Sequence, residues 1–430
     1  MKLNTFLLTL LLLSSTINQL AYAQFTIDGQ ILQRAEYRNG FGKLLERGQE
    51  PAAFIGQRTR IQSNYSIDKF KFYASIQDIR IWGNTPQTKT SDDYLSVHEA
   101  WVETNLNENW SFKTGRQELN YDNFRFLGNL DWALQARAHD FALIKYEKEK
   151  VKIHFGGGFN QQEQRQTSTK YTLANQYKTA QLFRYENQGE KWQISFLLWN
   201  DGKEQGGKHY YKQTIGLPTL KYQINPKTSL SMYYYHQLGK NTQGKKISAY
   251  NASISIKHQI NYNEDATNKL QLVAGLELIS GTATDKTNKN HSYSPLYGTN
   301  HAHNGYMDYF YVGGAHENTV GLNDFFARAR YDFNAKLFIQ TDLHYFTTNA
   351  KTLDAAANKM NKYLGTEVDF SLVYLLHNAV SIQAGYSQMW ASDTMKRIKE
   401  AQNPIHSQNW AYVMLIARPT MKNKFIGILL

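Results

Sequence analysis

Arginine is the residue type in this sequence whose spacing first suggests chemistry. It recurs at every second position in two segments, as Arg58 and Arg60 and as Arg328 and Arg330. Residues two apart on a strand share a face, so each pair presents two guanidinium groups side by side. A guanidinium group is always charged and binds a carboxylate through two parallel hydrogen bonds. A row of such groups along a pore would attract carboxylate-bearing molecules and repel cations.

We therefore take eight arginines as candidates for anion binding along a pore: Arg58, Arg60, Arg80, Arg116, Arg125, Arg137, Arg328 and Arg330. Three acids among them, Asp122, Asp131 and Asp140, are expected to orient guanidinium groups or to form turn hydrogen bonds. The alternative is that the arginines are ordinary lumen charges, paired with acids such as Asp78, Glu99, Glu103 or Asp332.

Other chemistry finds little support. The sequence contains no cysteine, which excludes disulfides, thiolate metal sites and a cysteine nucleophile. The three glycines at 156–158 lack the Lys-Ser/Thr of a phosphate loop, and there is no G-x-S-x-G elbow. The histidines of residues 284–316 have no carboxylate or cysteine at a ligand-like spacing. We expect no metal, no cofactor and no enzymatic activity.

The elements that must position the arginines are strands with period-two alternation. In residues 327–333 one face carries Ala, Ala, Tyr and Phe, and the other carries Arg, Arg and Asp. Eighteen such segments occur, at 24–37, 54–66, 69–82, 94–106, 109–118, 137–147, 150–163, 177–188, 190–202, 209–223, 227–239, 247–262, 268–283, 317–332, 335–348, 363–376, 379–390 and 407–418.

The gaps between these segments alternate between short and long. Most short gaps contain the Asn, Asp, Gly or Pro that tight turns require. Short periplasmic turns and long extracellular loops are typical of outer-membrane barrels. The sequence thus predicts an all-β, transmembrane antiparallel barrel of about 18 strands, with both chain ends on the periplasmic side.

The first 23 residues are predicted to be a signal peptide. Lys2 precedes an apolar run, and residues 21–23 form an A-x-A cleavage site. Residues 24–430 then form a single barrel domain in the outer membrane of a Gram-negative bacterium, in contact with its lipid. The formal charge of +12 favours a polyanionic partner or anionic lipid, and the secretory signal argues against nucleic acid.

Several local features extend this interpretation. Trp199, Tyr222, Tyr345 and Trp390 lie near strand ends, where aromatic girdles meet the membrane interface. Residues 119–136 are expected either to fold inward as a constriction loop or to pack on themselves at the surface. The tail after Pro419 is expected to be a periplasmic extension or a late strand segment, because proline cannot continue a ladder.

Three stretches resemble the alginate-export family of outer-membrane barrels, in a form like those of Bacteroidetes. They are GRQELNYDNFR with GNLDW and QARAHD at 115–140, PLYGTNH with GYMDYF at 295–310, and AGYSQMW at 384–390. The resemblance implies an eighteen-stranded barrel whose electropositive pore passes an anionic polysaccharide, with arginines at its constriction. Arg116, Arg125 and Arg137 occupy motif positions.

The leading hypothesis is a passive, monomeric channel that exports an anionic polysaccharide. Periplasmic export partners are possible partners of this channel. A general uptake porin for small anions or oligosaccharides is the second hypothesis. A barrel enzyme acting on lipid or glycan, and a structural or adhesive barrel, are the others. An enzyme would require a Ser/His/acid constellation in space, whereas a pore requires arginines that converge on the lumen.

Overall fold

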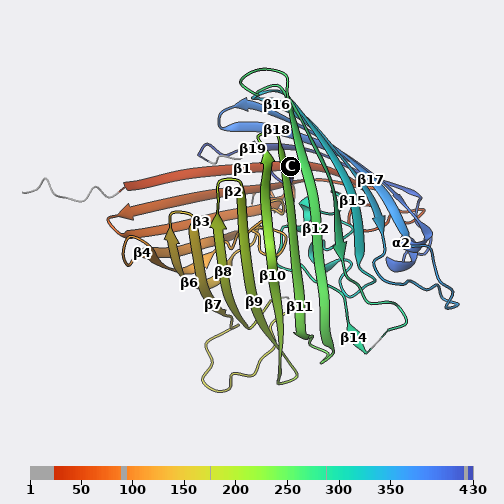
Figure 1. Cartoon of the computed structure of the whole chain (residues 1–430), viewed down its shortest axis with the longest axis horizontal. Coiled ribbons are helices and arrows are strands. Elements are labelled where there is room, and N and C mark those ends of the chain that lie inside the picture. Colours follow the sequence, from red (N-terminus) through yellow and green to blue (C-terminus); the bar gives the residue numbers. More distant parts are fainter. Residues whose placement is uncertain (1–23, 89–93, 175, 287, 421–424, 430) are drawn as a thin grey trace, which may run out of the picture.

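A computed structural model describes residues 24–88, 94–174, 176–286, 288–420 and 425–429 of the chain. The predicted signal peptide, residues 1–23, lies outside the described residues. The fold is a single β-barrel whose wall of tilted strands runs around the molecule (Figure 1). None of the helices in the described ranges is long and apolar enough to span a membrane.

Eighteen long strands form the wall, and all eighteen were predicted. They are β1 (Gln24–Asn39), β2 (Ala52–Ile67), β3 (Phe70–Ile81), β4 (Leu95–Asn105), β5 (Trp110–Gln117), β6 (His139–Lys148), β7 (Val151–Phe159), β8 (Thr179–Gln188), β9 (Trp192–Gln205), β10 (Lys208–Asn225), β11 (Thr228–Lys240), β12 (Lys246–Asn261), β13 (Lys269–Ile279), β15 (Leu322–Asn334), β16 (Leu337–Thr347), β17 (Tyr363–His377), β18 (Val380–Ala391) and β19 (Ser407–Ala417).

The wall closes on itself without a free edge. Each long strand pairs antiparallel with its neighbours in the chain, and β1 pairs with β19 from Ile31 opposite Ala417 to Asn39 opposite Asn409. The two-residue strand β14 (Lys289–Asn290) only adds parallel to β12 from a loop. A closed ladder satisfies the backbone hydrogen bonds of a chain that crosses lipid.

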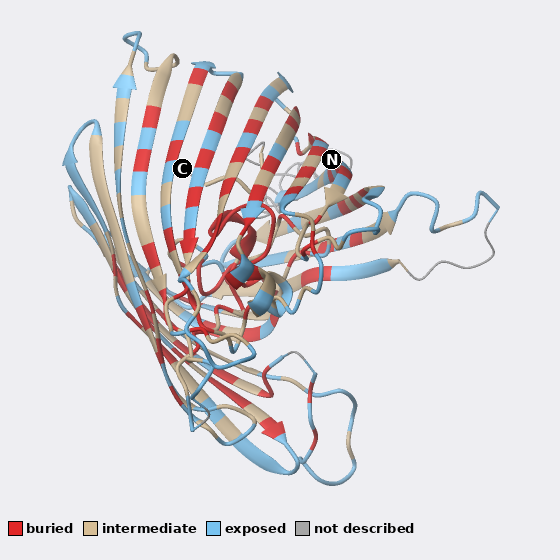
Figure 2. Ribbon diagram, turned by 90° about the vertical axis from the view of Figure 1, so that its right-hand side faces the viewer, coloured by how far each residue is buried: buried red, intermediate tan, exposed pale blue. Residues whose placement is uncertain are grey.

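Alternate residues along each strand face opposite environments, and Figure 2 shows the resulting bands of buried and exposed residues. On β15, Asp324 and Arg328 are buried, whereas Phe325 is 46% exposed and Phe333 42% exposed. Exposed apolar side chains on one face and buried charges on the other are the reverse of a soluble protein. They fit a lipid-facing outer surface and a polar interior.

The connections follow the predicted asymmetry except between β9 and β10, which are joined at the extracellular end by residues 206 and 207 alone. The turns that follow β2, β4, β6, β8, β10, β15 and β17 are short, and those that follow β1, β5, β7, β13, β16 and β18 are long. The loop after β18 carries the short helix α2 (Asp393–Ile398), and the loop after β13 carries the 3₁₀ turns Asn300–Ala302 and Val312–Gly314. The strand expected from residue 317 begins at Leu322, because Gly321 adopts a φ of +71° in the preceding loop.

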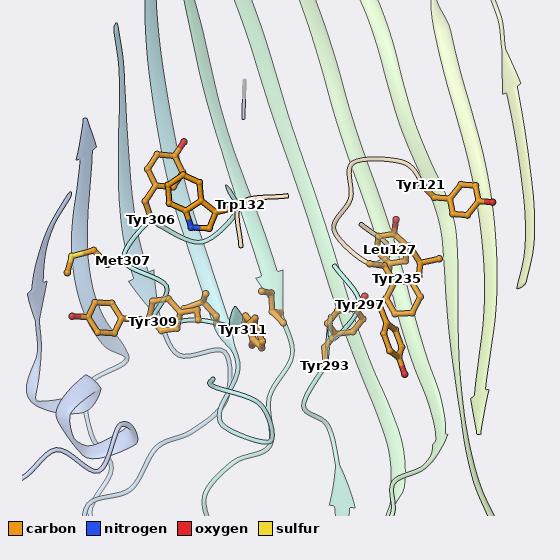
Figure 3. Packing of buried hydrophobic residues seen from close by; sticks show 14 of the residues in the cluster. Tyr121, Leu127, Trp132, Tyr235, Tyr293, Tyr297, Tyr306, Met307, Tyr309 and Tyr311 are labelled. Atoms are coloured by element: carbon orange, nitrogen blue, oxygen red, sulfur yellow. The ribbon is translucent and has the colours of Figure 1, made fainter. Parts of the chain in front are cut away.

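Long loops fill the interior with aromatic side chains. Figure 3 shows Trp132, Tyr297 and Tyr306 of these loops packed inside the strand wall. The predicted girdle is only partly correct. Trp390 is exposed, but Trp199 is fully buried and stacks on Phe141 inside the barrel.

Candidate pore constriction

The loop between β5 and β6, residues 118–138, enters the barrel. Trp132 stacks on His301 with ring centroids 3.9 Å apart and ring planes at 5°. Arg34 of β1 donates to the carbonyl oxygen of Trp132 at 2.8 Å, and Phe126 is buried. The alternative of a surface loop that packs on itself is therefore wrong, and we name residues 118–138 the constriction loop.

A second inward loop, residues 280–321 between β13 and β15, is hydrogen-bonded to the constriction loop. The amide of Gly128 donates to the carbonyl of Tyr297 at 3.0 Å, and the amide of Thr299 donates to the carbonyl of Phe124 at 2.8 Å. Because the contacts are backbone hydrogen bonds from both sides, the two loops form one folded unit inside the wall.

The C-terminal tail also lies in the lumen. The side-chain amide of Gln383 donates to the carbonyl of Ile426 and that of Gln340 to the carbonyl of Leu429, each at 2.9 Å. A Cβ atom at Gly427 would lie 2.4 Å from the Trp132 ring. Residues 425–429 are thus neither a strand segment nor an extension into the periplasm, because they pack against the inner wall and the constriction loop.

One side of the lumen is an arginine wall, which we define as Arg34, Arg58, Arg60 and Arg418. Arg58 contacts Asp131 of the constriction loop at 2.6 Å, and Arg418 contacts the other oxygen of this carboxylate at 2.9 Å. Burial alone would raise the pKa of Asp131, but Arg58 and Arg418 hold this pKa below its usual range. Arg60 donates to Gln77, whose amide donates to the constriction loop at the carbonyl of Gln135.

Another part of the wall is acidic and comprises Glu277, Asp324, Asp342, Glu367 and Asp369 of β13 and β15–β17. It binds donors of the second loop. The amide of Met307 donates to Glu367 at 2.8 Å, and the Tyr306 hydroxyl donates to Asp342 at 3.0 Å. The side-chain amide of Asn304 reaches both Glu277 and Asp324. We name this set the acidic wall.

Three further predicted arginines point inward, and each has a carboxylate partner. Arg125 of the constriction loop is fully buried and contacts Glu277 at 2.8 Å. Arg328 contacts Asp342 at 3.0 Å, and Arg330 contacts Asp332 at 2.6 Å. The ring of Phe338 lies 3.5 Å from the Arg330 guanidinium carbon.

Two predicted pore arginines lie on the outer face of the barrel. Arg80 is opposite Gln57 and shares its strand face with Ile76, which is 43% exposed. Arg116 is opposite Asp140 and shares its face with exposed Phe112. The prediction that these two arginines line the pore does not agree with their register, because period-two alternation turns each of them away from the lumen.

Arg137 differs from the other candidates in its partners. Its guanidinium donates to the carbonyls of Gly298 at 2.8 Å and Gly128 at 3.4 Å, and no carboxylate of the described chain lies within ion-pair distance of it. Burial therefore lowers its pKa to about 10. It borders a cavity of about 200 Å³ together with His139 and Tyr177.

Each of the three predicted acids meets an arginine. Asp131 pairs with Arg58, and Asp140 pairs with Arg116 at 3.2 Å on the outer face. Asp122 pairs with Arg184 of β8 at 3.0 Å, and it also accepts a hydrogen bond from Ser195.

The lumen is not uniformly basic. Among the buried charged residues of the described chain, acids outnumber bases. The bases are Arg34, Arg58, Arg60, Arg125, Lys178, Arg184, Arg328 and Arg418, and the acids are Glu36, Glu99, Glu186, Asp201, Glu204, Glu277, Asp308, Asp324, Asp332, Asp342, Glu367 and Asp369. Positive charge is concentrated on the arginine wall.

Sequence reasoning missed Arg34, Arg184 and Arg418. The first two carried a usable signal, because Arg34 stands two residues before Glu36 and Arg184 two before Glu186, which places each pair on one strand face. Arg418 next to Pro419 carried none, since its partner is 287 positions away.

The loop histidines have ordinary partners, as in His301 with Asp308 at 2.6 Å. A group that sequence reasoning overlooked comprises His98, Glu99 and Glu118, whose ligand-type atoms lie within 4.8 Å of one another. His98 is the extra residue of a β-bulge in β4, between Val97 opposite Ile76 and Glu99 opposite Ser75, and both His98 and Glu99 are buried. His98 is already 2.9 Å from Glu118 in an ion-pair geometry, so the group alone does not indicate a metal.

The family follows from comparison with known proteins. The family model described as alginate export matches residues 24–405, which includes nearly the whole barrel. The chain belongs to the alginate export family. A comparison with curated proteins gives no match.

Solved structures of similar fold include proteins of Pseudomonas aeruginosa, among them the outer membrane protein OpdK. OpdK with vanillate aligns with a TM-score of 0.58 at 12% identity, over 91% of this chain and 98% of that one. OccK3 (OpdO) gives 0.57 at 12%, over 91% and 95%, and OccK8 (OprE) gives 0.57 at 10%, over 91% and 98%. At this identity the likeness shows the fold. Together with the family, it places the chain in a Gram-negative outer membrane, as a barrel of the channel type.

Proposed function

We propose that this chain is a channel for anionic polysaccharides or oligosaccharides, and that cargo carboxylates move along the arginine wall. The observation that carries the proposal is the gathering of Arg34, Arg58, Arg60 and Arg418 beside the constriction loop, where Arg58 and Arg418 share the carboxylate of Asp131. Two of these guanidinium groups share one carboxylate, and Arg60 donates to the side-chain amide of Gln77. Weak, multiple binding of this kind is what conduction requires.

The test is conductance of the full-length protein in planar bilayers. We expect anion selectivity and block by added oligouronates. Arg60→Gln should reduce both, since it removes a guanidinium group of the arginine wall that donates to an amide, Gln77, and not to a carboxylate. Arg80→Gln is the matched control, because Arg80 lies on the outer face. Cation selectivity of the wild type, or equal effects of the two variants, would contradict the proposal.

Uptake of small anions is the second candidate. The lumen is filled by two loops and the tail, which favours small solutes over a polymer. A structural neighbour, OpdK, was solved with the carboxylate vanillate. Block that strengthens with oligouronate length would favour the polymer, whereas length-independent block would favour small anions. Periplasmic partners and the monomeric state stay predictions.

A further inference from the structure

A polar cavity of about 150 Å³ opens at the extracellular rim. It lies between the ends of β9, β10 and β11 and the second inward loop, and its lining includes Lys203, Lys212, Lys240 and Tyr210. These strand ends are extracellular because the short turns before β9 and after β10 are at the periplasmic end. The cavity lies beside neither the arginine wall nor the acidic wall, so the constriction does not account for it.

Its lysines are less neutralised than the lumen arginines. Lys212 lies opposite Asp201 across β9 and β10, at 4.0 Å, the limit for an ion pair. Lys203 lies opposite Tyr210. Within the described part of the chain, no carboxylate comes within 4.0 Å of Lys203 or Lys240. Three ammonium groups therefore share the cavity with two carboxylates.

Both carboxylates already accept hydrogen bonds from loop hydroxyl groups. Asp201 accepts from Tyr297 at 3.2 Å, and Glu317 accepts from Ser294 at 2.8 Å. Each carboxylate keeps its single negative charge, so the three ammonium groups of the cavity exceed its two carboxylates by one charge. The surplus of positive charge leaves a place for an external anion.

The remaining lining consists largely of amide and hydroxyl groups, such as those of Gln237, Asn241 and Ser292. Gln237 is fixed by paired hydrogen bonds with the backbone of Ser294, at 2.8 and 3.0 Å. Amides and hydroxyl groups both donate and accept, which suits a ring with several hydroxyl groups. The volume of about 150 Å³ is about ten times what one water molecule requires, which leaves space for a small ring.

We propose that this rim cavity binds one carboxylate-bearing sugar unit at the extracellular mouth, with the lysines holding the carboxylate. The inference rests on the proposed function and adds a subsite to it. Lysine binds a carboxylate as a point charge without the fixed fork of arginine. A ring held there exchanges readily, as a cargo at the mouth of a channel must.

The test is block of the channel by a triuronate added to one side of a bilayer that contains the full-length protein. Lys203→Gln combined with Lys212→Gln should raise the half-blocking concentration about tenfold, the equivalent of about 1.4 kcal/mol, and only for extracellular addition. Lys359→Gln with Lys362→Gln is the control, because it removes two exposed lysines from another extracellular loop and should change the value less than about twofold.

The outcomes separate the two proposals. If the wild type is anion-selective and the Lys203/Lys212 variant is blocked like the control, the rim site is wrong and the channel function stands. If the wild type is neither anion-selective nor blocked, the function itself fails. Should the double variant not insert, Lys203→Gln alone serves, and the conservative Lys203→Arg must retain block. Equal block by a neutral trisaccharide would also overturn the role of the lysines.

Discussion

At the scale of single residues, the same ion pair has different consequences on the two faces of the wall. Asp131 is enclosed by Arg58 and Arg418, whose side chains are almost completely buried. Asp140 and Arg116 form an exposed pair. Removing one partner of a buried pair leaves an uncompensated charge, whereas an exposed pair is already solvated and screened.

Asp131→Asn should therefore destabilise the barrel much more than Asp140→Asn. We expect losses of about 3–5 kcal/mol for the first and below about 1 kcal/mol for the second. Urea unfolding in detergent measures both. The first variant should also show noisier channel currents, because Asp131 attaches the constriction loop to the arginine wall. Equal losses would mean that this ion pair does not hold the loop.

Lys399 follows α2 in an extracellular loop, and its contact with the second inward loop depends on pH. Its ammonium donates to the carbonyl of Tyr309 and lies 5.2 Å from the Phe310 ring. Burial lowers the pKa of Lys399 to about 7. The titratable group facing it is His316, whose pKa burial and Lys399 together lower to about 3, so His316 stays neutral above pH 6.

The sign follows from proton binding in the two states. Between pH 7 and 10.5 the unfolded chain keeps the Lys399 proton and the folded chain has lost it, so stability rises with pH in this window by up to about 1.4 kcal/mol per unit. Below pH 7 the cost of burying the charge is fully present. At pH 6 the wild type should have a lower unfolding midpoint than Lys399→Met, because only the wild type buries the charge. At pH 9 the difference between the two midpoints should be smaller. A constant difference would contradict the assigned pKa.

At the scale of elements, the strands could be predicted and the paths of the loops could not. The sequence of a strand such as β15 identifies it locally, because Arg328 and Asp332 alternate with apolar neighbours. Arg80 and Arg116 show the limit of that reasoning, since a strand near its extracellular end can be polar on both faces. The contact between Arg125 and Glu277 spans 152 positions, and neither residue contains a local signal for the other.

The tail is the element whose position has the most direct test. Deleting residues 425–430 should increase single-channel conductance, because it removes chain held in the lumen by Gln340 and Gln383. Gly427→Val should also increase single-channel conductance, although it deletes no residue. Gly427 has a φ of +77° and its added Cβ would meet the Trp132 ring, so a β-branched residue would displace the tail. Unchanged conductance in both variants would show that the tail does not restrict the path.

At the scale of the whole molecule, positive and negative charges lie on different parts of the inner wall. The chain carries a formal charge of +12, yet its buried acids outnumber its buried bases. The arginine wall holds the constriction loop, and the acidic wall holds the second loop through Met307 and Tyr306. The acidic wall also contacts the constriction loop, through Glu277 and Arg125. Both walls thus position the loops that narrow the lumen, and many of their charges are engaged in these contacts.

This separation predicts a selectivity that depends on salt. An arginine that is already paired with a carboxylate attracts a passing anion through its long-range electrostatic field and not by direct contact. Salt screens this field over about 10 Å at 0.1 M but over about 3 Å at 1 M. The anion-to-cation permeability ratio, measured from reversal potentials across a salt gradient, should be well above one at 0.1 M and approach one at 1 M. Selectivity that persists at 1 M would instead require anions to contact desolvated guanidinium groups directly, with Arg137 as the residue to replace first because no carboxylate competes for it among its described partners.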